Sequence, residues 1–279
     1  MEFQITKKAK NVTFGLMGVG LLLTIIGAAI SAGEHHFLTR FMASALISGF
    51  FFFALGLGAL FFLALKYATE TGWYAAVKRV IEAVAGFLPV GMIILGVVLL
   101  VITYKDGAHI YSWMDPKVIA HDEVVRHKAA YLNPVFFWIR TLAYFTTYFL
   151  FWRGFKRRSL EEDKVGGTEL HFKNYKRGAI FLVFFAVFSS TSAWDWIMSI
   201  DVHWFSTLFG WYTFAGMWCS TMVVLVLTTL YLKKLGYLEK VNDSHIHDLG
   251  KWTFATSFLW SYLWFSQFML IWYSNIPEE

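Results

Sequence analysis

Cysteine is nearly absent from the sequence, with Cys219 the single example in 279 residues. One thiol cannot form a disulfide within the chain, and a protein-bound iron–sulfur cluster needs about four ligands, usually cysteine thiolates. The C-x-x-C-H motif of covalent haem attachment is also missing. The sequence therefore excludes a cluster or a c-type haem held by this chain alone.

Histidine is missing from the interior of the long apolar stretches, because all nine histidines fall in loops or at stretch ends. A transmembrane b-type haem needs axial ligands, usually paired histidines, inside such stretches. A di-haem cytochrome is therefore not expected, and no metal site is predicted. The sequence also has no Walker motif, which excludes ATP-driven transport by this chain alone.

Charged residues are scarce at 15%, whereas soluble domains carry about 25%. Apolar residues make up 57% of the chain and aromatic residues 20%, a composition that fits lipid-facing and interfacial side chains. A soluble fold would expose too much apolar surface, so the sequence predicts an all-α, polytopic membrane protein. The net charge of +5 comes from basic residues in loops, which indicates membrane topology rather than a nucleic-acid partner.

Seven apolar stretches are each long enough to cross the hydrocarbon core as a helix. The loops between them are short, so a single integral membrane domain over residues 1–279 is expected. The predicted spans are 12–32, 41–65, 82–103, 133–152, 179–199, 207–232 and 252–273.

Small residues punctuate the first three predicted spans. Glycines permit close contact between transmembrane helices, and a proline inside a span kinks it. Pro89 is expected to kink the third span, and close contacts are expected at Gly15, Gly20, Gly27, Gly56, Gly58, Gly86 and Gly91.

The lysines and arginines set the orientation of the chain. With a cytoplasmic N-terminus, 18 of the 24 lie in inner segments and 5 in outer segments, while Arg140 lies within a span. This bias follows the positive-inside rule and predicts a cytoplasmic N-terminus. The loop containing Asp201 and His203 is then on the outer side, which in a bacterium is the periplasm.

A carboxylate inside an apolar span is a functional hypothesis by default, and Asp195 is such a group. At 1.5 Å per residue it lies roughly 8 Å inside the outer end of the fifth span. Arg140 lies about 10 Å from the outer start of the fourth span by the same rise. The two residues have similar depth on consecutive helices, so an Arg140–Asp195 ion pair is predicted. Alternatively, this pair only fixes helix packing.

Hydroxyl groups surround the predicted position of Asp195. Ser192 and Ser199 lie on the same helix face, and this stripe could hold waters and pass protons to the periplasm. Equally, such hydroxyls often bond their own helix carbonyls. Glu82, at the inner start of the third span, is a candidate for cytoplasmic proton entry, although a helix N-terminus also favours acids.

Asp201 and His203 sit at a span end, where solvent and substrate head groups meet. Histidine accepts a proton near neutral pH, and an adjacent carboxylate can orient its ring. This pattern suits quinol oxidation, because each two-electron oxidation releases two protons. The alternative is a solvated loop in which the aspartate caps the sixth span and Trp204 anchors the interface.

The stretch from Trp194 to Thr207 reads Trp-Asp-Trp-Ile-Met-Ser-Ile-Asp-Val-His-Trp-Phe-Ser-Thr. Together with Gly210–Tyr212, Gln267 and the ending Trp272–Glu279, it resembles the polysulfide-reductase/NrfD-like membrane subunits of quinone-linked respiratory complexes. The similarity runs along the whole chain. More specifically, the sequence resembles the second such subunit of bacterial alternative complex III, a quinol:electron-acceptor oxidoreductase.

The resemblance implies a haem-free, multi-pass subunit in the bacterial inner (plasma) membrane. It would support the oxidation of menaquinol or ubiquinol, with a role in proton conduction or in assembly, and with no covalently bound cofactor and no redox centre of its own. Its implied partners are a related quinol-binding membrane subunit, a periplasmic iron–sulfur subunit, multi-haem cytochrome c subunits and lipids. The resemblance also implies about ten spans in two four-helix bundles, so further C-terminal spans are expected beyond residue 279.

Two other functions stay open from the residues. A stand-alone secondary transporter would also place a charge inside a span, at its substrate site. A purely structural scaffold subunit would use the same charge for packing.

Overall fold

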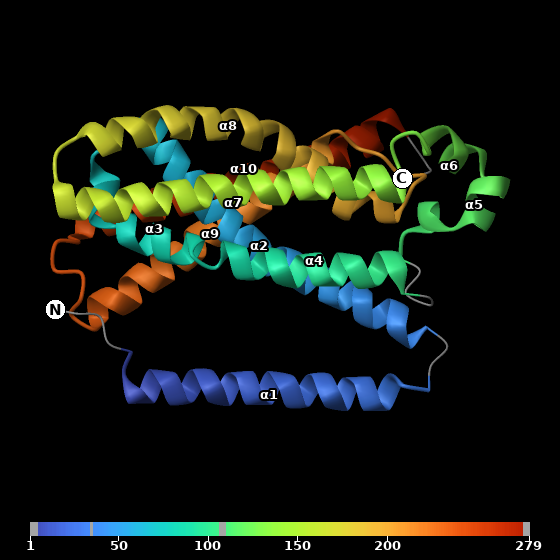
Figure 1. Ribbon diagram of the computed structural model, residues 1–279, viewed down its shortest axis with the longest axis horizontal. Helices are drawn as coiled ribbons and strands as arrows, with labels where there is room; N and C mark the ends of the chain where they lie inside the picture. The colour runs from blue at the N-terminus through green and yellow to red at the C-terminus, as the bar shows by residue number, and fades with distance from the viewer. Residues whose placement is uncertain (1–4, 34–35, 106–109, 276–279) are drawn as a thin grey trace.

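The computed structural model describes residues 5–33, 36–105 and 110–275, and these residues form helices and connecting loops without a β-strand (Figure 1). The elements are α1 (Lys7–Ser31), α2 (Phe37–Ala68), the 3-10 helix η1 (Trp73–Ala76), α3 (Lys78–Ala85), α4 (Leu88–Tyr104), η2 (Ser112–Met114), α5 (Pro116–His121), α6 (Glu123–Lys128), α7 (Pro134–Val165), α8 (Glu169–Trp196), η3 (Met198–Ile200), α9 (Leu208–Lys234) and α10 (Asp243–Ser274).

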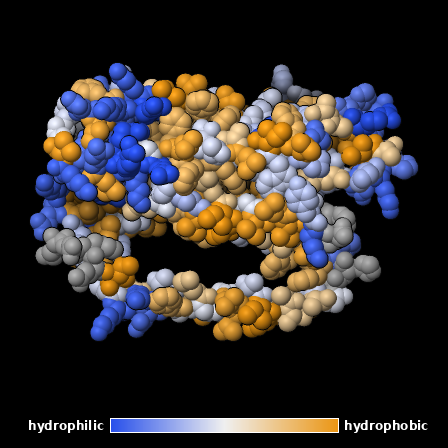
Figure 2. Space-filling model, viewed as in Figure 1, coloured by the Kyte–Doolittle hydropathy of each residue, from blue (hydrophilic) through white to orange (hydrophobic). Residues whose placement is uncertain are grey.

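Several of these helices are long and apolar enough to cross a membrane. In the described part of the chain, five segments meet that criterion, with mean hydropathies from 1.5 to 2.7. Figure 2 shows an apolar band between two hydrophilic ends. The prediction of an all-α chain with several helices able to span a membrane is therefore confirmed for the described residues. The five segments are α1, α2, Lys78–Tyr104, Glu169–Ile200 and α9.

Two further helices, α7 and α10, have 32 residues each and contain the predicted spans 133–152 and 252–273. Both carry more polar residues than the five segments. Figure 1 shows α7 lying alongside α8, and α10 packs against α9.

Helix α2 forms the centre of the bundle and packs against α3, α4, α8 and α9. Two glycines let α2 and α4 approach closely. A Cβ atom built on Gly91 would lie 2.9 Å from the Cα of Phe53, and one on Gly56 would lie 2.9 Å from the Cα of Leu88. Both glycines are therefore at helix contacts, as predicted.

The glycines of α1 make no such contact with the described residues of this chain. A Cβ atom on Gly15, Gly20 or Gly27 would meet no other atom within 4 Å. None of the described residues of α1 is buried. Figure 2 shows an opening between this helix and the rest of the molecule.

The predicted kink at Pro89 is an interruption of the helix. α3 ends at Ala85, and α4 begins at Leu88 with the proline in its first turn. Proline has no backbone N–H, and its ring clashes with the carbonyl group four residues earlier, here that of Ala85. The residues Gly86 and Phe87 carry the chain across this break.

Lys66 belongs to the core rather than to a loop, where the end of the predicted span 41–65 placed it. It lies in the last turn of α2 and is 2% exposed. Its ammonium group lies 4.8 Å from the ring centroids of Phe62 and Trp73 and 4.2 Å from that of Trp252. Attraction between the cation and these ring faces connects α2 to η1 and α10.

Replacing Gly91 with alanine is expected to lower the free energy of unfolding by about 1–3 kcal/mol, because the new methyl group must displace the α2 backbone. Unfolding in mixed detergent micelles measures this change. Gly20→Ala is the matched control on α1, where the methyl group meets open space. Equal stability of the two variants would contradict the α2–α4 contact.

Candidate functional site

Asp195 and Arg140 form a buried, bidentate ion pair between α8 and α7. Arg140 Nη2 donates to Asp195 Oδ1 and Arg140 Nε donates to Asp195 Oδ2, each at 2.8 Å. The aspartate is 0% exposed and the arginine 9%. The ion pair predicted from depth matching is therefore confirmed.

Tyr144 is a third member of this network, and its hydroxyl donates to Asp195 Oδ2 at 2.8 Å. Tyr144 lies one helical turn after Arg140 on α7, so both point to the same side of that helix. Each carboxylate oxygen of Asp195 therefore accepts at least one charge-assisted hydrogen bond, which is the stronger class.

The guanidinium group of Arg140 is held by aromatic rings as well. Its Cζ lies 3.8 Å from the ring centroid of Tyr131 and 4.3 Å from that of Phe136. Arg140 Nη1 also donates to the carbonyl oxygen of Tyr131 at 3.0 Å. Partial burial and the nearby Asp195 carboxylate raise the pKa of Tyr131 to about 12, so its phenol stays protonated at neutral pH.

Local capping explains why α8 ends just after Asp195. The last carbonyl groups of a helix lack partners in the helix itself. The Ser199 hydroxyl donates to the Asp195 carbonyl oxygen at 2.6 Å, and the Tyr111 hydroxyl donates to the Trp196 carbonyl oxygen at 2.7 Å. The negative end of the helix dipole disfavours an anion at this point, so the Asp195 carboxylate depends on Arg140.

The hydroxyl stripe bonds to backbone rather than to the Asp195 carboxylate. Ser192 Oγ donates to the carbonyl oxygen of Ser189 at 3.2 Å, and Thr191 Oγ1 to that of Val187 at 3.0 Å. These hydroxyl groups therefore bond to carbonyl oxygens of their own helix, which is the stated alternative to a proton path. Whether these hydroxyl groups carry protons stays a prediction.

A cavity of about 590 Å³ lies next to the ion pair. Tyr131 lines it and also contacts Arg140, so the cavity wall and the buried charges share a residue. Thr191, Ser199 and Asp201 contribute polar groups to the lining. The other lining residues are His127, Lys128, Ala130, Leu132, Trp194, Met198, Val202, Trp204 and Phe205.

Asp201 and His203 are close in space, but their side chains do not form the predicted pair. Asp201 Oδ1 accepts from the backbone N–H of His203 at 3.0 Å and from that of Trp204 at 3.3 Å. It therefore caps a turn in the loop, six residues before the Thr207 N-cap of α9. The carboxylate that contacts the His203 ring is Asp122, at 2.7 Å from Nε2.

Asp122 lies between α5 and α6, two short helices in the connection from α4 to α7. Backbone N–H groups of Val125 and Val124, together with the His203 ring, lower the pKa of the Asp122 carboxyl. Lys128 also donates to the carbonyl oxygen of Val202. These contacts join the connection between α4 and α7 to the loop between α8 and α9.

Glu82 lies far from Asp195. It sits in the second turn of α3, so the helix N-terminus does not explain it, and it pairs with Arg79. Arg79 in turn contacts Ser159 and Asp163 on α7. Those residues follow Arg140 by about five turns, so Glu82 and Asp195 occupy opposite ends of the bundle.

Sequence reasoning missed the aromatic members of the site, Tyr131, Phe136 and Tyr144. The spacing of Arg140 and Tyr144, four residues apart on one helix, is the signal that could have found the hydroxyl partner. No protein-family model matches the sequence, and the search of curated proteins returned no match.

Proposed function

We propose that this protein is a membrane subunit of a respiratory quinol:electron-acceptor oxidoreductase of the alternative complex III type. In this proposal it crosses the bacterial inner membrane seven times within residues 1–279, with a cytoplasmic N-terminus. It acts beside a related quinol-binding subunit, a periplasmic iron–sulfur subunit and multi-haem cytochrome c subunits. The sequence motifs around Asp195 and Gln267 are the basis of this assignment.

The observation that supports the proposal best is the buried Arg140–Asp195–Tyr144 network beside the 590 Å³ cavity. Ionisable residues inside spans are costly and mark proton or substrate pathways by default. Pockets for small ligands are mostly apolar with few polar groups, and this cavity has that character. A quinol ring held there would lie against Asp201, and Tyr131 would connect it to the buried ion pair.

The chemistry requires a route for two protons and two electrons, because oxidation of a quinol to a quinone releases both. In this proposal the electrons leave through the iron–sulfur and haem groups of partner subunits. Asp195 and its hydroxyl neighbours then handle protons at the outer side of the membrane. The exposed His203 ring and the partly exposed Asp122 carboxylate offer groups through which protons reach the periplasm.

A structural scaffold is the second candidate, and one observation favours it. The Asp195 carboxylate is saturated by Arg140 and Tyr144, and the nearby hydroxyl groups bond to backbone carbonyls. A fully satisfied buried pair can specify helix packing without taking part in turnover.

Purification of the intact protein from native membranes tests the proposal. We expect c-haem and iron–sulfur absorbance to co-purify with it, together with quinol:cytochrome c turnover. Asp195→Asn is expected to lower turnover about tenfold or more at unchanged haem content. Tyr144→Phe, which keeps the ion pair, should give a smaller loss, and Asp243→Asn on the exposed start of α10 is the matched control.

Three results would each reject part of this proposal. Full quinol turnover in an assembled complex that carries Asp195→Asn would reject proton handling by Asp195 and leave the structural scaffold as the remaining function. Transport by the isolated protein in liposomes, without haem or iron–sulfur partners, would indicate a secondary transporter. A purified protein with neither quinol turnover nor redox partners would reject the respiratory assignment.

A further inference from the structure

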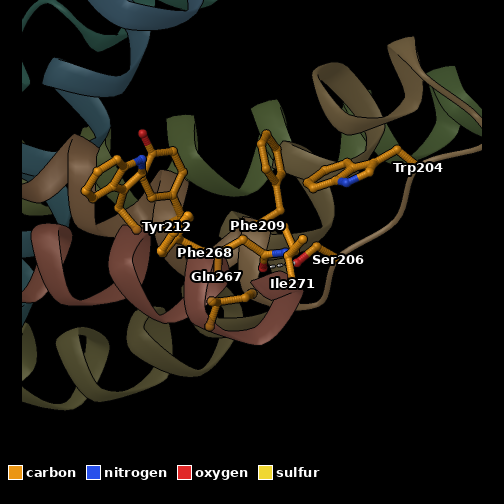
Figure 3. A pocket seen from close by; sticks show the side chains of 9 residues that line it. Trp204, Ser206, Phe209, Tyr212, Gln267, Phe268 and Ile271 are labelled. Carbon is orange, nitrogen blue, oxygen red and sulfur yellow. Dashed lines mark hydrogen bonds between the residues drawn. The ribbon is translucent and has the colours of Figure 1, made fainter. Parts of the chain in front are cut away.

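A second cavity, of about 350 Å³, lies between α9 and α10 near their outer ends (Figure 3). Residues of the loop before α9 close one side of it. Its size falls within the range of about 300–1,000 Å³ that is usual for small-ligand pockets. The lining residues are Trp204, Ser206, Leu208, Phe209, Tyr212, Trp264, Gln267, Phe268 and Ile271.

Most of the lining of this cavity is aromatic. The Trp204 and Phe209 rings meet edge to face, with centroids 5.6 Å apart, and the Tyr212 ring stacks on Trp260 behind it at 5.9 Å. Rings held by other rings offer flat walls with defined orientation. Such walls favour a planar ligand over a flexible acyl chain.

Gln267 provides the polar group of the cavity. Its Oε1 accepts a hydrogen bond from Ser206 Oγ at 2.9 Å, which fixes the direction of the amide. Figure 3 shows these two side chains meeting beside the aromatic residues. Among the described residues, the one hydrogen-bond partner given for the Gln267 amide is Ser206, which leaves the Nε2 N–H groups available to a ligand.

The position of Gln267 along α10 indicates what kind of ligand group its amide N–H can bind. It lies seven residues before Ser274, the end of α10, and so about 10 Å inside the helix end. A polar group in an apolar environment costs free energy unless it is hydrogen-bonded. A ligand with a carbonyl oxygen would satisfy the amide N–H that the protein leaves open.

We propose that this cavity binds the ring of a quinone, with Gln267 Nε2 donating to a carbonyl oxygen of the ring. This inference rests on the proposed function and adds a binding position distinct from the cavity that contains Asp201. Trp204 lines both cavities, so the two positions are neighbours. The isoprenoid tail of the ligand would run along exposed apolar residues of α10, including Phe265.

Photolabelling of the intact complex in lipid nanodiscs with an azido-quinone tests this position. Mass spectrometry should find the label on peptides covering 204–212 and 264–271, and excess unlabelled quinone should remove it. Gln267→Leu is expected to reduce labelling about fivefold, the value of one hydrogen bond. Trp264→Leu should also reduce it, whereas Trp272→Leu is the matched control, since both indoles are about two-thirds exposed and Trp272 does not line the cavity.

The outcomes separate this inference from the proposed function. Label confined to 127–132 and 191–202, with quinol turnover intact, would overturn the inference and keep the function. Label found only on a partner subunit would also overturn it. So would a crosslink between a partner helix and the thiol of a Phe268→Cys variant. Absence of both labelling and quinol turnover in the complex would reject the proposed function itself.

Discussion

Replacing Arg140 with methionine is expected to lower the free energy of unfolding by about 3–5 kcal/mol. The substitution leaves the Asp195 carboxylate buried, 0% exposed, and without its cation. Tyr144 still donates one hydrogen bond, but a hydroxyl group cannot neutralise the charge. The loss is therefore that of an uncompensated buried anion, which exceeds the net value of the ion pair itself.

A double-mutant cycle isolates this effect. Arg140→Met combined with Asp195→Asn removes both charges, so the double variant should be more stable than Arg140→Met alone. Denaturation of each variant by SDS in mixed micelles gives the required free energies. Additive losses from the two single variants would show that the residues do not interact, against the 2.8 Å contacts.

The exposed pair of Lys233 and Asp243 serves as the control for this cycle. Its atoms are 3.0 Å apart, yet the Asp243 side chain is fully exposed. Solvent screens such a pair, so Lys233→Met should leave stability without a measurable change. The contrast tests whether burial, and not the presence of an ion pair, determines the size of the loss.

The Arg140–Asp195 pair could be predicted from the sequence because depth follows directly from residue count. Both residues lie on helices that are consecutive in the sequence, and a fixed rise per residue converts position into depth. The multi-span helical fold followed from apolar length in the same way. Both predictions require only the position of each residue along one axis, the membrane normal.

The contacts that the sequence did not predict depend on geometry that residue count alone does not determine. The rotation of each helix and the folding of the loops between helices decide which side chains meet. Asp122 and His203 are 81 residues apart in the sequence, so their contact depends on how two loops dock. Lys66 looked like a loop cation because its distance from Trp252 depends on the packing of α2 against α10.

Replacing Trp196 with alanine is expected to lower the free energy of unfolding by about 3–5 kcal/mol, the cost of a large cavity in a packed core. Trp196 is 0% exposed, and its ring lies 5.6 Å from Phe53, 5.7 Å from Tyr144 and 5.5 Å from Phe145. Its indole N–H also donates to Thr141 Oγ1 at 3.1 Å. The variant loses contacts to α2 and α7 together.

The same substitution should reach the ion pair, because Tyr144 rests against the Trp196 ring while donating to Asp195. Trp196→Phe keeps an aromatic ring there and loses mainly the hydrogen bond to Thr141, so it should cost less. Trp272→Ala, at a ring that is 66% exposed, controls for the loss of an indole from the outer part of the bundle. If Trp196→Ala and Trp272→Ala destabilise the protein equally, the ring beside Asp195 does not support the buried charges. A larger loss at Trp196, with Trp196→Phe between the two, means that aromatic packing on α8 holds Tyr144 in place and that the carboxylate depends on it.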